Sequence, residues 1–547
     1  MKTLFKLLLC LFFSAAFQIP SYGQPEIKTY DSLLSTIFPK DGPGGTVLIS
    51  KAGKVLFNKA YGKANLELNV PMRTEHVFRL GSITKQFTAV CILKLLEEGK
   101  LSLEDQLIKF IPDYPLNGKK ITIANLLTHT SGIKNYTALS AFNENLKHQD
   151  RSPKELIDLF KDQPLDFEPG SDYKYSNSGY VLLGYIIEKL SGKTYGEYAQ
   201  KNIFEPLQMS NSYYDERSKV ISERISGYRK RNGRYENSDF LSMTLPYAAG
   251  SLLSTTGDLL KWYTGLEDGK VISRASLELA HTSGRLANGK ETGYGFGWEI
   301  GNIQGSKAIK HNGIVNGFFT DVIYLPTEEI FVSILANYEN IGDLDIAVAK
   351  LAAIALGRPY IFNTKVIESA GLQQYQAVYS NPYEGERFIT NQDGVLMYYH
   401  KGGGKTRLIP YGTDIFLLEN SLNSLMFQRD GEGTINGYQI KGTGGTTSIW
   451  KKSKEIPLIN RINISSQVLI RYTGKYLFEP NMLFEVILEN GKLFGRVGND
   501  QKELTPFEEN KFYANDIDAT VIFNLDKSGQ TISVTKIQNS EMRAKKL

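Results

Sequence analysis

One short segment of this chain has a serine and a lysine at a spacing that acyl transfer could use. Ser82 and Lys85 stand three positions apart, so a helix that starts at Ser82 places both side chains on one face. A serine hydroxyl attacks a carbonyl carbon after a base has taken its proton. A lysine amine, with its ordinary pKa of about 10.4, becomes that base at neutral pH only where burial or a nearby cation lowers the pKa. Alone, S-x-x-K is also the pattern of a helix-capping serine beside a surface lysine.

Two further segments have polar side chains suited to the same chemistry. Tyr175-Ser176-Asn177 follows the turn Phe167-Glu168-Pro169-Gly170, and a loop there can place a phenol and an amide in a cleft. His311-Asn312-Gly313 precedes two apolar segments, and a glycine at this point lets a substrate approach the backbone closely. Taken singly, each has a simpler interpretation: a core tyrosine beside a turn asparagine, and a hairpin turn with a surface histidine.

The elements that must position these residues mix strand and helix patterns over residues 30–360. Strands are expected at 46–49 and 54–57, joined at Gly53, and again at 320–325 and 330–335; helices are expected at 84–98, 179–190 and from Thr255-Thr256 onward. Strands at both ends with helices between them predict an α+β fold. Its antiparallel sheet is closed by the first and last segments and flanked by helices.

Residues 372–538 differ, because alternation of apolar and polar residues replaces helical periodicity. This part repeats itself. Tyr375, Tyr379, Pro410, Phe416 and Phe427 are matched by Tyr472, Tyr476, Pro506, Phe512 and Phe523, at an offset of 97 and then 96 positions. Asp393-Gly394 and Asn490-Gly491 are hairpin-turn signals at matching positions. We therefore predict two similar small antiparallel β-barrel or half-barrel modules, at residues 372–450 and 466–540.

The composition excludes several functional classes. Lys and Arg (63) outnumber Asp and Glu (58) by only five, which gives no reason to expect nucleic-acid binding. His76, His148 and His400 lack the spacing of metal ligands and no H-E-x-x-H occurs, so neither a metal nor another cofactor is expected. Gly402–Thr406 ends like a phosphate-binding loop, but Tyr399 stands where its first glycine would be.

The N-terminus is predicted to be a cleaved secretion signal. Two lysines precede the apolar run Leu7–Phe17, which is too short to span a bilayer. Small residues before Gln24 favour cleavage there, so residues 1–23 form the signal. Cleavage also removes Cys10 and leaves Cys91 as the one cysteine, which excludes an intramolecular disulfide. No other apolar run is long enough to span a membrane, and a periplasmic or secreted protein is expected.

Together, these segments resemble the serine β-lactamase and penicillin-binding-protein superfamily, in particular its class C β-lactamase-like branch. The resemblance rests on Phe78-Arg79-Leu80-Gly81-Ser82-Ile83-Thr84-Lys85, Leu126-Leu127-Thr128-His129-Thr130-Ser131-Gly132, Phe167 to Tyr180, Ala249-Gly250-Ser251-Leu252 and Tyr294-Gly295-Phe296-Gly297-Trp298. It covers residues 30–360. It implies a β-lactamase-like serine hydrolase domain, which we place at residues 24–362.

The resemblance also implies a role for each site residue. Ser82 is the nucleophile that forms an acyl-enzyme, and Lys85 and Tyr175 share the proton transfers; which of the two is the acylation base is disputed across the superfamily. We expect Lys85 to lower the pKa of Tyr175, and Tyr175 to pass a proton to the leaving group. Asn177 is expected to hold the acyl-side amide of the substrate. The backbone N–H groups of Ser82 and Ile314 are expected to form the oxyanion hole.

One position departs from the class C pattern. Class C enzymes carry a lysine at the start of the third motif, where this sequence has His311, with Gly313 completing the motif as a further substrate-binding residue. A lysine is a fixed cation for a substrate carboxylate, whereas a histidine with a pKa of about 6.5 is mostly neutral at pH 7. His311 is similar to the DD-peptidase, esterase and D-aminopeptidase branches. A catalytic domain followed by two barrel modules is also similar to bacterial D-aminopeptidases.

The sequence therefore predicts a secreted serine hydrolase that cleaves an amide or peptide bond, with D-amino-acid peptides or peptidoglycan fragments as substrates. Two alternatives use the same site: a carboxylesterase, because His311 relaxes the demand for a substrate carboxylate, and a weak β-lactamase. The alternative from another class is a non-catalytic binder of a cell-wall ligand, and the intact set of Ser82, Lys85, Tyr175 and Asn177 argues against it. A small peptide, amide or ester is the expected partner, and the oligomeric state stays open.

Overall fold

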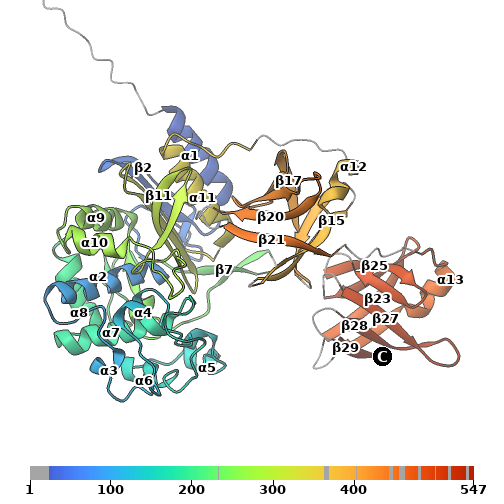
Figure 1. Cartoon of the computed structure of the whole chain (residues 1–547), viewed down its shortest axis with the longest axis horizontal. Helices are drawn as coiled ribbons and strands as arrows, with labels where there is room; N and C mark the ends of the chain where they lie inside the picture. Colours follow the sequence, from blue (N-terminus) through green and yellow to red (C-terminus); the bar gives the residue numbers. More distant parts are fainter. Residues whose placement is uncertain are drawn as a thin grey trace, which may run out of the picture. The chain divides into compact units, whose positions relative to one another are not determined.

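The structure is a computed structural model that describes residues 24–547 apart from 232, 340, 363–368, 383, 393, 402, 443–446, 455–461, 479–481, 499, 515–518 and 538–540. The predicted signal at residues 1–23 and Asp393 of the predicted hairpin turn lie outside the described residues. The chain forms two compact units (Figure 1). The first comprises the chain up to Ile300 together with Ser306–Pro359, and the second comprises Gly301–Gly305 together with Tyr360–Leu547.

The first unit is built on a six-stranded sheet in which early and late segments of the chain meet. Its strands, in spatial order, are β10 (Glu299–Ile303), β11 (Ser306–Val315), β12 (Phe318–Leu325), β13 (Ile330–Ala336), β1 (Gly45–Lys51) and β2 (Lys54–Tyr61). The pairs from β11 through to β2 are antiparallel, and β1 pairs with β13 from Gly45 opposite Ala336 onward. This confirms the predicted sheet closed by the first and last segments.

Helices cover both faces of this sheet. Every residue of β12 and β13 is buried, which requires protein on each side of the strands. On one side α1 (Gln24–Ile37) and α11 (Ile341–Ala355) pack together and against the strands. On the other side α9 (Thr256–Glu267) packs against β1 and β13, and its Tyr263 ring lies 5.2 Å from Phe331.

The helical layer is organised around α2 (Thr84–Glu97), of which eleven of fourteen residues are buried. Such a helix is apolar on all sides because it has neighbours on all sides. The ring of Phe87 stacks on Trp262 of α9 at 4.2 Å. The other helices of this unit are α3 (Leu107–Phe110), α4 (Ile123–Leu127), α5 (Glu144–Lys147), α6 (Pro153–Asp158), α7 (Asn177–Ser191), α8 (Tyr195–Ala199) and α10 (Arg274–Ala280). Of these, α7 packs along α2.

Three small sheets complete the first unit. One has the order β5 (Phe78–Arg79), β9 (Leu252–Ser254), β6 (Tyr213–Tyr214), and it leads directly into the turn before α2. The other two are the pairs β3 (Lys63–Asn65) with β4 (Val70–Pro71) and β7 (Tyr228–Arg231) with β8 (Arg234–Asn237). The sheet of β5, β9 and β6 matters most for the site, because it fixes where the chain enters α2.

The second unit contains two closed barrels of eight strands each. The first consists of β14 (Ala377–Asn381), β15 (Gly385–Gln392), β16 (Val395–Tyr399), β17 (Thr406–Gly412), β18 (Ile415–Leu418), β19 (Ser424–Arg429), β20 (Ile435–Lys441) and β21 (Thr447–Lys454). The second consists of β22 (Gly474–Phe478), β23 (Met482–Glu489), β24 (Lys492–Val497), β25 (Asp500–Glu508), β26 (Lys511–Ala514), β27 (Ala519–Leu525), β28 (Thr531–Ile537) and β29 (Glu541–Lys546). Short helices, α12 (Ser369–Leu372) and α13 (Ser466–Leu469), precede them.

The internal repeat has a direct structural counterpart in the two barrels. The Tyr379 hydroxyl donates to the carbonyl oxygen of Tyr375 at 2.9 Å, and the Tyr476 hydroxyl donates to that of Tyr472 at 2.7 Å. Both donors are buried, so each bond satisfies a phenol that water cannot reach. The spacing of four residues is therefore conserved between the modules because it closes the same hydrogen bond.

The proline and phenylalanine of the repeat also occupy equivalent places. Pro410 on β17 stands opposite Phe416, and Pro506 on β25 stands opposite Phe512. The strand register shifts immediately after each proline, which indicates a bulge. A proline lacks the N–H of a regular ladder, so a bulge is the point where a barrel strand tolerates it. The predicted pair of antiparallel β modules is confirmed.

Two features are absent from the part of the chain that the structure describes. Within the described ranges, no helix combines the length and the apolar composition needed to cross a membrane. In the same residues, no three side chains of His, Cys, Asp or Glu gather closely enough to bind a metal ion.

Candidate active site

Ser82 stands where a short strand turns into the buried helix. β5 ends at Arg79, and a 3-10 turn, Gly81–Ile83, leads into α2. Gly81 has a φ of 53°, a left-handed conformation that glycine adopts without the steric cost of a Cβ. Ser82 is partly exposed and caps no backbone N–H, whereas its two neighbours are buried. The turn thus presents the hydroxyl at the N-terminus of α2, where the helix dipole favours negative charge.

Lys85, on the first turn of α2, is fully buried and has three oxygen atoms within hydrogen-bonding distance. Its Nζ lies 3.1 Å from Ser82 Oγ, 2.8 Å from Asn177 Oδ1 and 2.9 Å from the carbonyl oxygen of Ala249. No carboxylate among the described residues pairs with it, and burial lowers the pKa of the amine well below its usual value. A neutral amine has two N–H donors and one lone pair. The two N–H groups can donate to Asn177 Oδ1 and to the carbonyl oxygen of Ala249, and the lone pair can accept from the Ser82 hydroxyl.

The Lys85 amine lies over the face of the Tyr175 ring and forms no hydrogen bond with its hydroxyl. Lys85 Nζ is 4.7 Å from the centroid of the ring, over its face. The hydroxyl is buried and forms no well-aligned hydrogen bond with a described residue. Burial raises the pKa of Tyr175, and the nearby Ser82 hydroxyl only partly offsets that effect. The expectation that Lys85 lowers this pKa is therefore wrong, because the amine faces the ring and desolvation dominates. Tyr175 is a neutral phenol, which is a proton donor.

Asn177 begins α7, and its side chain and backbone are both held in place. Its Oδ1 accepts the hydrogen bond from Lys85, and its Nδ2 lies 3.5 Å from Thr137 Oγ1. Its backbone N–H donates to Asn135 Oδ1 at 3.2 Å. Because Lys85 occupies Oδ1, the Nδ2 group is the part of the amide that can donate to a substrate carbonyl.

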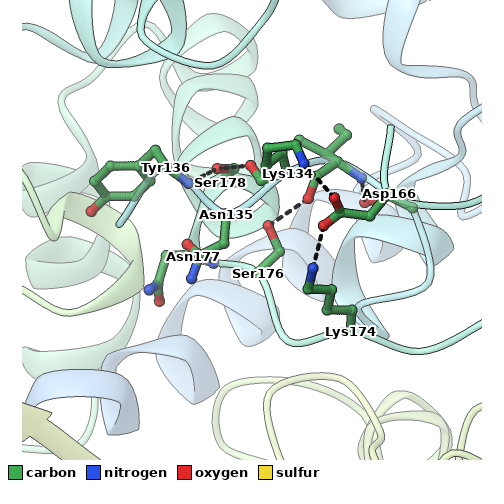
Figure 2. Close-up of polar contacts among 10 residues, drawn as sticks. Lys134, Asn135, Tyr136, Asp166, Lys174, Ser176, Asn177 and Ser178 are labelled. Carbon is green, nitrogen blue, oxygen red and sulfur yellow. Dashed lines mark hydrogen bonds and ion pairs between the residues drawn. The ribbon is translucent and has the colours of Figure 1, made fainter. Parts of the chain in front are cut away.

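The loop before α7 is joined to residues 133–136 by a set of polar contacts, which Figure 2 shows. The Ser176 and Ser178 hydroxyls donate to carbonyl oxygens of that segment at 3.0 and 2.7 Å. Asp166 accepts from Lys174 and from the lysine of the same segment, at 2.6 Å each. These bonds flank Tyr175 on both sides in the sequence. They restrict the loop that brings the phenol and the Asn177 amide to Lys85.

His311 lies within β11, not in the hairpin turn that its sequence also allowed, and it is 2% exposed. Its Nε2 is 2.9 Å from Tyr294 Oη, and its Nδ1 is 2.6 Å from the carbonyl oxygen of Asn312. Since a carbonyl only accepts, Nδ1 carries the proton and Nε2 accepts from the tyrosine hydroxyl. Burial lowers the pKa of His311 to about 4. The side chain is a neutral imidazole and supplies no fixed cation at neutral pH.

The strand β11 passes directly against the Ser82 turn. A Cβ at Gly313 would lie 1.9 Å from the carbonyl oxygen of Leu80, and a Cβ at Gly81 would lie 2.7 Å from the backbone nitrogen of Ile314. Only glycine allows two backbones to come this close. The Ile314 N–H group therefore lies beside the serine turn, as the predicted oxyanion hole requires, and its side chain is 46% exposed.

His129 is hydrogen-bonded to the residues on both sides of Tyr175, a contact that the sequence, which suggested only a scaffold role near the cleft, did not reveal. Its carbonyl accepts from the Lys174 N–H at 3.0 Å, and its Nδ1 accepts from the Ser176 N–H at 3.2 Å. Its ring lies 4.4 Å from the Tyr175 ring. Its Nε2 is buried without a partner among the described residues, and burial lowers its pKa well below the usual value. The signal in the sequence was the H-T-S-G stretch of the family resemblance.

A family comparison agrees with this geometry. The sequence profile of the Beta-lactamase family matches residues 35–356. That range includes the sheet, the helical layer and every side chain of the site described above. The match therefore rests on the same part of the chain as the site.

Two curated relatives are similar to this chain over part of their length. A penicillin-binding protein of Bacillus subtilis is 31% identical over 388 residues, which cover 68% of this chain and 84% of that protein. The human mitochondrial serine β-lactamase-like protein LACTB is 30% identical over 304 residues, which cover 43% of this chain and 55% of that protein.

Solved structures share the architecture. An octameric penicillin-binding protein homologue from Pyrococcus abyssi superposes with a TM-score of 0.55 at 25% identity, over 87% of this chain and 99% of that one. A D-stereospecific amidohydrolase from Streptomyces superposes with a TM-score of 0.52 at 24% identity, over 59% of this chain and 98% of that one. The similarity to the amidohydrolase shows a shared fold alone.

The contacts of His129 predict that His129→Ala lowers kcat/KM by about ten- to a hundredfold, because a misplaced Tyr175 no longer meets the reacting atoms. His129→Asn restores part of the activity, since an asparagine oxygen can accept from the Ser176 N–H and asparagine tolerates the left-handed φ of 58° at this position. Steady-state kinetics with circular dichroism melting measures both effects.

His281 provides the matched control for this prediction. It stands in the second H-T-S-G sequence, is buried, and also has an Nε2 without a partner among the described residues, but it packs edge-on against Trp298 at 4.9 Å. His281→Ala should lower the melting temperature comparably while keeping kcat/KM. Equal losses of activity in the two alanine variants would show that His129 acts through stability alone.

The pH dependence of the reaction is predicted to follow Lys85 and not His311. If the free amine of Lys85 is the base, kcat/KM rises with pH as Lys85 loses its proton and then levels off, with a midpoint well below the usual pKa of a lysine. His311, with a pKa of about 4, stays neutral above pH 6. A pH–rate profile of His311→Gln should therefore keep the acid limb of the wild type. Loss of that limb in the variant would assign the titration to His311.

Proposed function

The chain belongs to the β-lactamase family of serine hydrolases, and we propose that it cleaves amide or peptide bonds of small D-amino-acid peptides or peptidoglycan fragments through an acyl-enzyme on Ser82. The observation that carries the proposal is the buried Lys85 amine 3.1 Å from the Ser82 hydroxyl, without a carboxylate partner in the described residues. A desolvated amine is deprotonated far more easily than an exposed one, so it can act as a base near neutral pH.

Acylation uses the residues in a fixed order. Ser82 Oγ bonds to the substrate carbonyl carbon while its proton passes to Lys85 Nζ. The negative charge that develops on the carbonyl oxygen is stabilised by the N–H groups of Ser82 and Ile314; loss of one such donor costs about 3 kcal/mol of transition-state stabilisation. The C–N bond then breaks as the leaving nitrogen takes a proton from the Tyr175 phenol, and the proton held by Lys85 Nζ passes to the Tyr175 phenolate, which restores the neutral amine and the neutral phenol.

Deacylation repeats these steps with water in place of the serine. Water attacks the ester carbon, its proton passes to the same base, and the Ser82 oxygen leaves with a proton from the same donor. Asn177 keeps the acyl group in place through both halves, because its Nδ2 is available to the carbonyl of the acyl-side amide. The products are a free acid and an amine.

The neutral state of His311 bears on the choice among substrates. A β-lactam brings a carboxylate that a lysine at this position would pair with, whereas a neutral imidazole bonded to Tyr294 supplies no charge. We therefore expect β-lactam hydrolysis to be slow. The same observation favours a carboxylesterase as the second candidate, because a simple ester needs no carboxylate partner.

A single panel tests the proposal. Wild-type protein is assayed on matched D- and L-aminoacyl amides, simple esters and a β-lactam, and is labelled with a serine-directed phosphonate. Ser82→Ala should lose both turnover and labelling, because no other hydroxyl lies next to the Lys85 amine in the described residues. Ser35→Ala, on the exposed face of α1, is the control and should keep both.

The outcomes separate the candidates. A higher kcat/KM on D-aminoacyl amides than on their L-counterparts supports the peptidase proposal. A preference for esters beyond their intrinsic reactivity supports the carboxylesterase. Persistent labelling of Ser82→Ala contradicts the acyl-enzyme on Ser82, and substrate binding without any acylation revives the non-catalytic binder.

We also propose that the enzyme acts outside the cytoplasm, as the basic and apolar N-terminal residues suggest. N-terminal sequencing of protein from the cell envelope or medium should begin at Gln24. Recovery of uncleaved protein from the cytoplasm would contradict export.

A further inference from the structure

A cavity of about 660 Å³ opens in the first unit at β5. Its lining comes from Arg79 of β5, from the loop that follows β6 (214–218) and from Phe240–Thr244. A volume of several hundred Å³ is typical of sites that hold small organic ligands. The cavity therefore has room for a substrate group larger than one side chain.

One end of the lining segment Phe240–Thr244 is attached to the oxyanion strand. The carbonyl oxygen of Asp239 accepts a hydrogen bond from Asn316 Nδ2 at 3.0 Å. Asn316 follows Ile314 by two residues at the end of β11, and the Ile314 N–H is the proposed oxyanion donor. The segment is therefore tied to the end of the strand that carries Ile314.

The other end of the segment is attached to the loop that holds Asn177. The carbonyl oxygen of Leu245 accepts from the Tyr136 hydroxyl at 2.7 Å, and the neighbouring Asn135 accepts from the Asn177 N–H at 3.2 Å. The lining segment thus runs from the oxyanion strand to Asn177. Because Asn177 is the proposed partner of the acyl-side amide, the cavity lies on the acyl side of the scissile bond.

The outer wall of the cavity combines apolar surface with an unpaired cation. Phe240 is 48% exposed, and Leu241 and Met243 are nearly buried beside it. The guanidinium of Arg217 lies over the Phe240 ring, 5.8 Å from its centroid. Arg217 is exposed and has neither an ion pair nor a hydrogen bond with a residue that the structure describes. Its donors are available to a ligand.

The inner wall is also rich in guanidinium groups. Asp215, whose side chain is 2% exposed, accepts from Arg79 at 2.8 Å and from Arg224 at 3.0 Å. The two guanidinium groups therefore share one carboxylate. The other acids of the lining are Asp150, which accepts from a serine hydroxyl, and Glu216, which is exposed. Among the described residues, both inner arginines are thus paired, and Arg217 is the arginine of the lining left free to bind an anion.

We propose that this cavity binds the part of the substrate that continues beyond the acyl-side amide, and that this part is an apolar chain ending in a carboxylate received by Arg217. A guanidinium stacked on an aromatic ring is already oriented for two parallel bonds to a carboxylate. The inference rests on the proposed function and narrows it. A substrate whose acyl-side amine is free, as an aminopeptidase requires, has no group to fill the cavity. A substrate with an N-acyl group on that amine has one.

The test measures equilibrium binding of product-like acids to the full chain by titration calorimetry. N-succinyl-D-phenylalanine and N-butanoyl-D-phenylalanine match in length and differ by the terminal carboxylate. The succinyl acid should bind about tenfold more tightly, because its second carboxylate can accept charge-assisted hydrogen bonds from the guanidinium of Arg217. Arg217→Gln should abolish that preference. Lys219→Gln, which removes the same charge from an exposed side chain outside the lining, should keep it.

Each outcome decides one question. Equal affinity of the wild type for the two acids overturns the cavity proposal, because the terminal carboxylate would then add nothing to binding. The same change of preference in Arg217→Gln and Lys219→Gln also overturns it, because the carboxylate would then respond to long-range charge. If the wild type keeps its preference for the succinyl acid and yet fails to hydrolyse the 4-nitroanilides made from the same two acids, that result supports the cavity and contradicts the proposed function. Binding of unmodified D-phenylalanine as tightly as the succinyl acid would overturn the N-acylated donor in favour of an aminopeptidase.

Discussion

A lysine amine buried without a carboxylate is the constraint on which the site depends. Transfer of an ammonium ion out of water is so costly that the group gives up its proton instead. Lys85 remains useful in this state because Ser82, Asn177 and Ala249 place three oxygen atoms around its nitrogen. Two of them can accept its N–H groups while the serine donates to its lone pair. An exposed lysine at the same distance would stay protonated and could not take the serine proton.

The second constraint is the close approach of two backbones. Gly81 and Gly313 lie where the serine turn meets β11, and a Cβ at either position would collide with main-chain atoms. This contact joins the helical layer, which holds Ser82, to the sheet, which supplies Ile314. The proposed nucleophile and the proposed oxyanion donor therefore come together only when the two layers pack. The position of the proposed oxyanion donors therefore depends on that packing, and donors fixed in advance can stabilise the charge that develops on the substrate oxygen.

Two histidines contribute shape and hydrogen bonds to this site and no charge. His311 accepts from Tyr294 and donates to its neighbouring carbonyl, and His129 accepts from the backbone N–H that follows Tyr175. Both lie in an apolar and aromatic surrounding that lowers their pKa values. In the cavity proposed to bind the acyl side of the substrate, Arg217 is the arginine without an ion pair among the described residues, whereas Arg79 is paired with Asp215. Recognition of an anionic substrate would then take place away from the reacting carbonyl, where it does not disturb the neutral amine.

Local patterns were enough to predict the β1–β2 hairpin, α2, the late strands and the two repeated barrels, because alternation, helical periodicity and turn residues act over a few neighbours. They did not reveal that His311 lies inside a strand, since Asn312-Gly313 interrupts the pattern of β11 as a turn would. The four key side chains of Ser82, Lys85, Tyr175 and Asn177 were identified through motifs, but the lowered pKa of Lys85 and the raised pKa of Tyr175 were decided by tertiary structure. Desolvation depends on which atoms surround a group in space, and those atoms come from segments more than a hundred residues apart, such as Ala249 and Lys85.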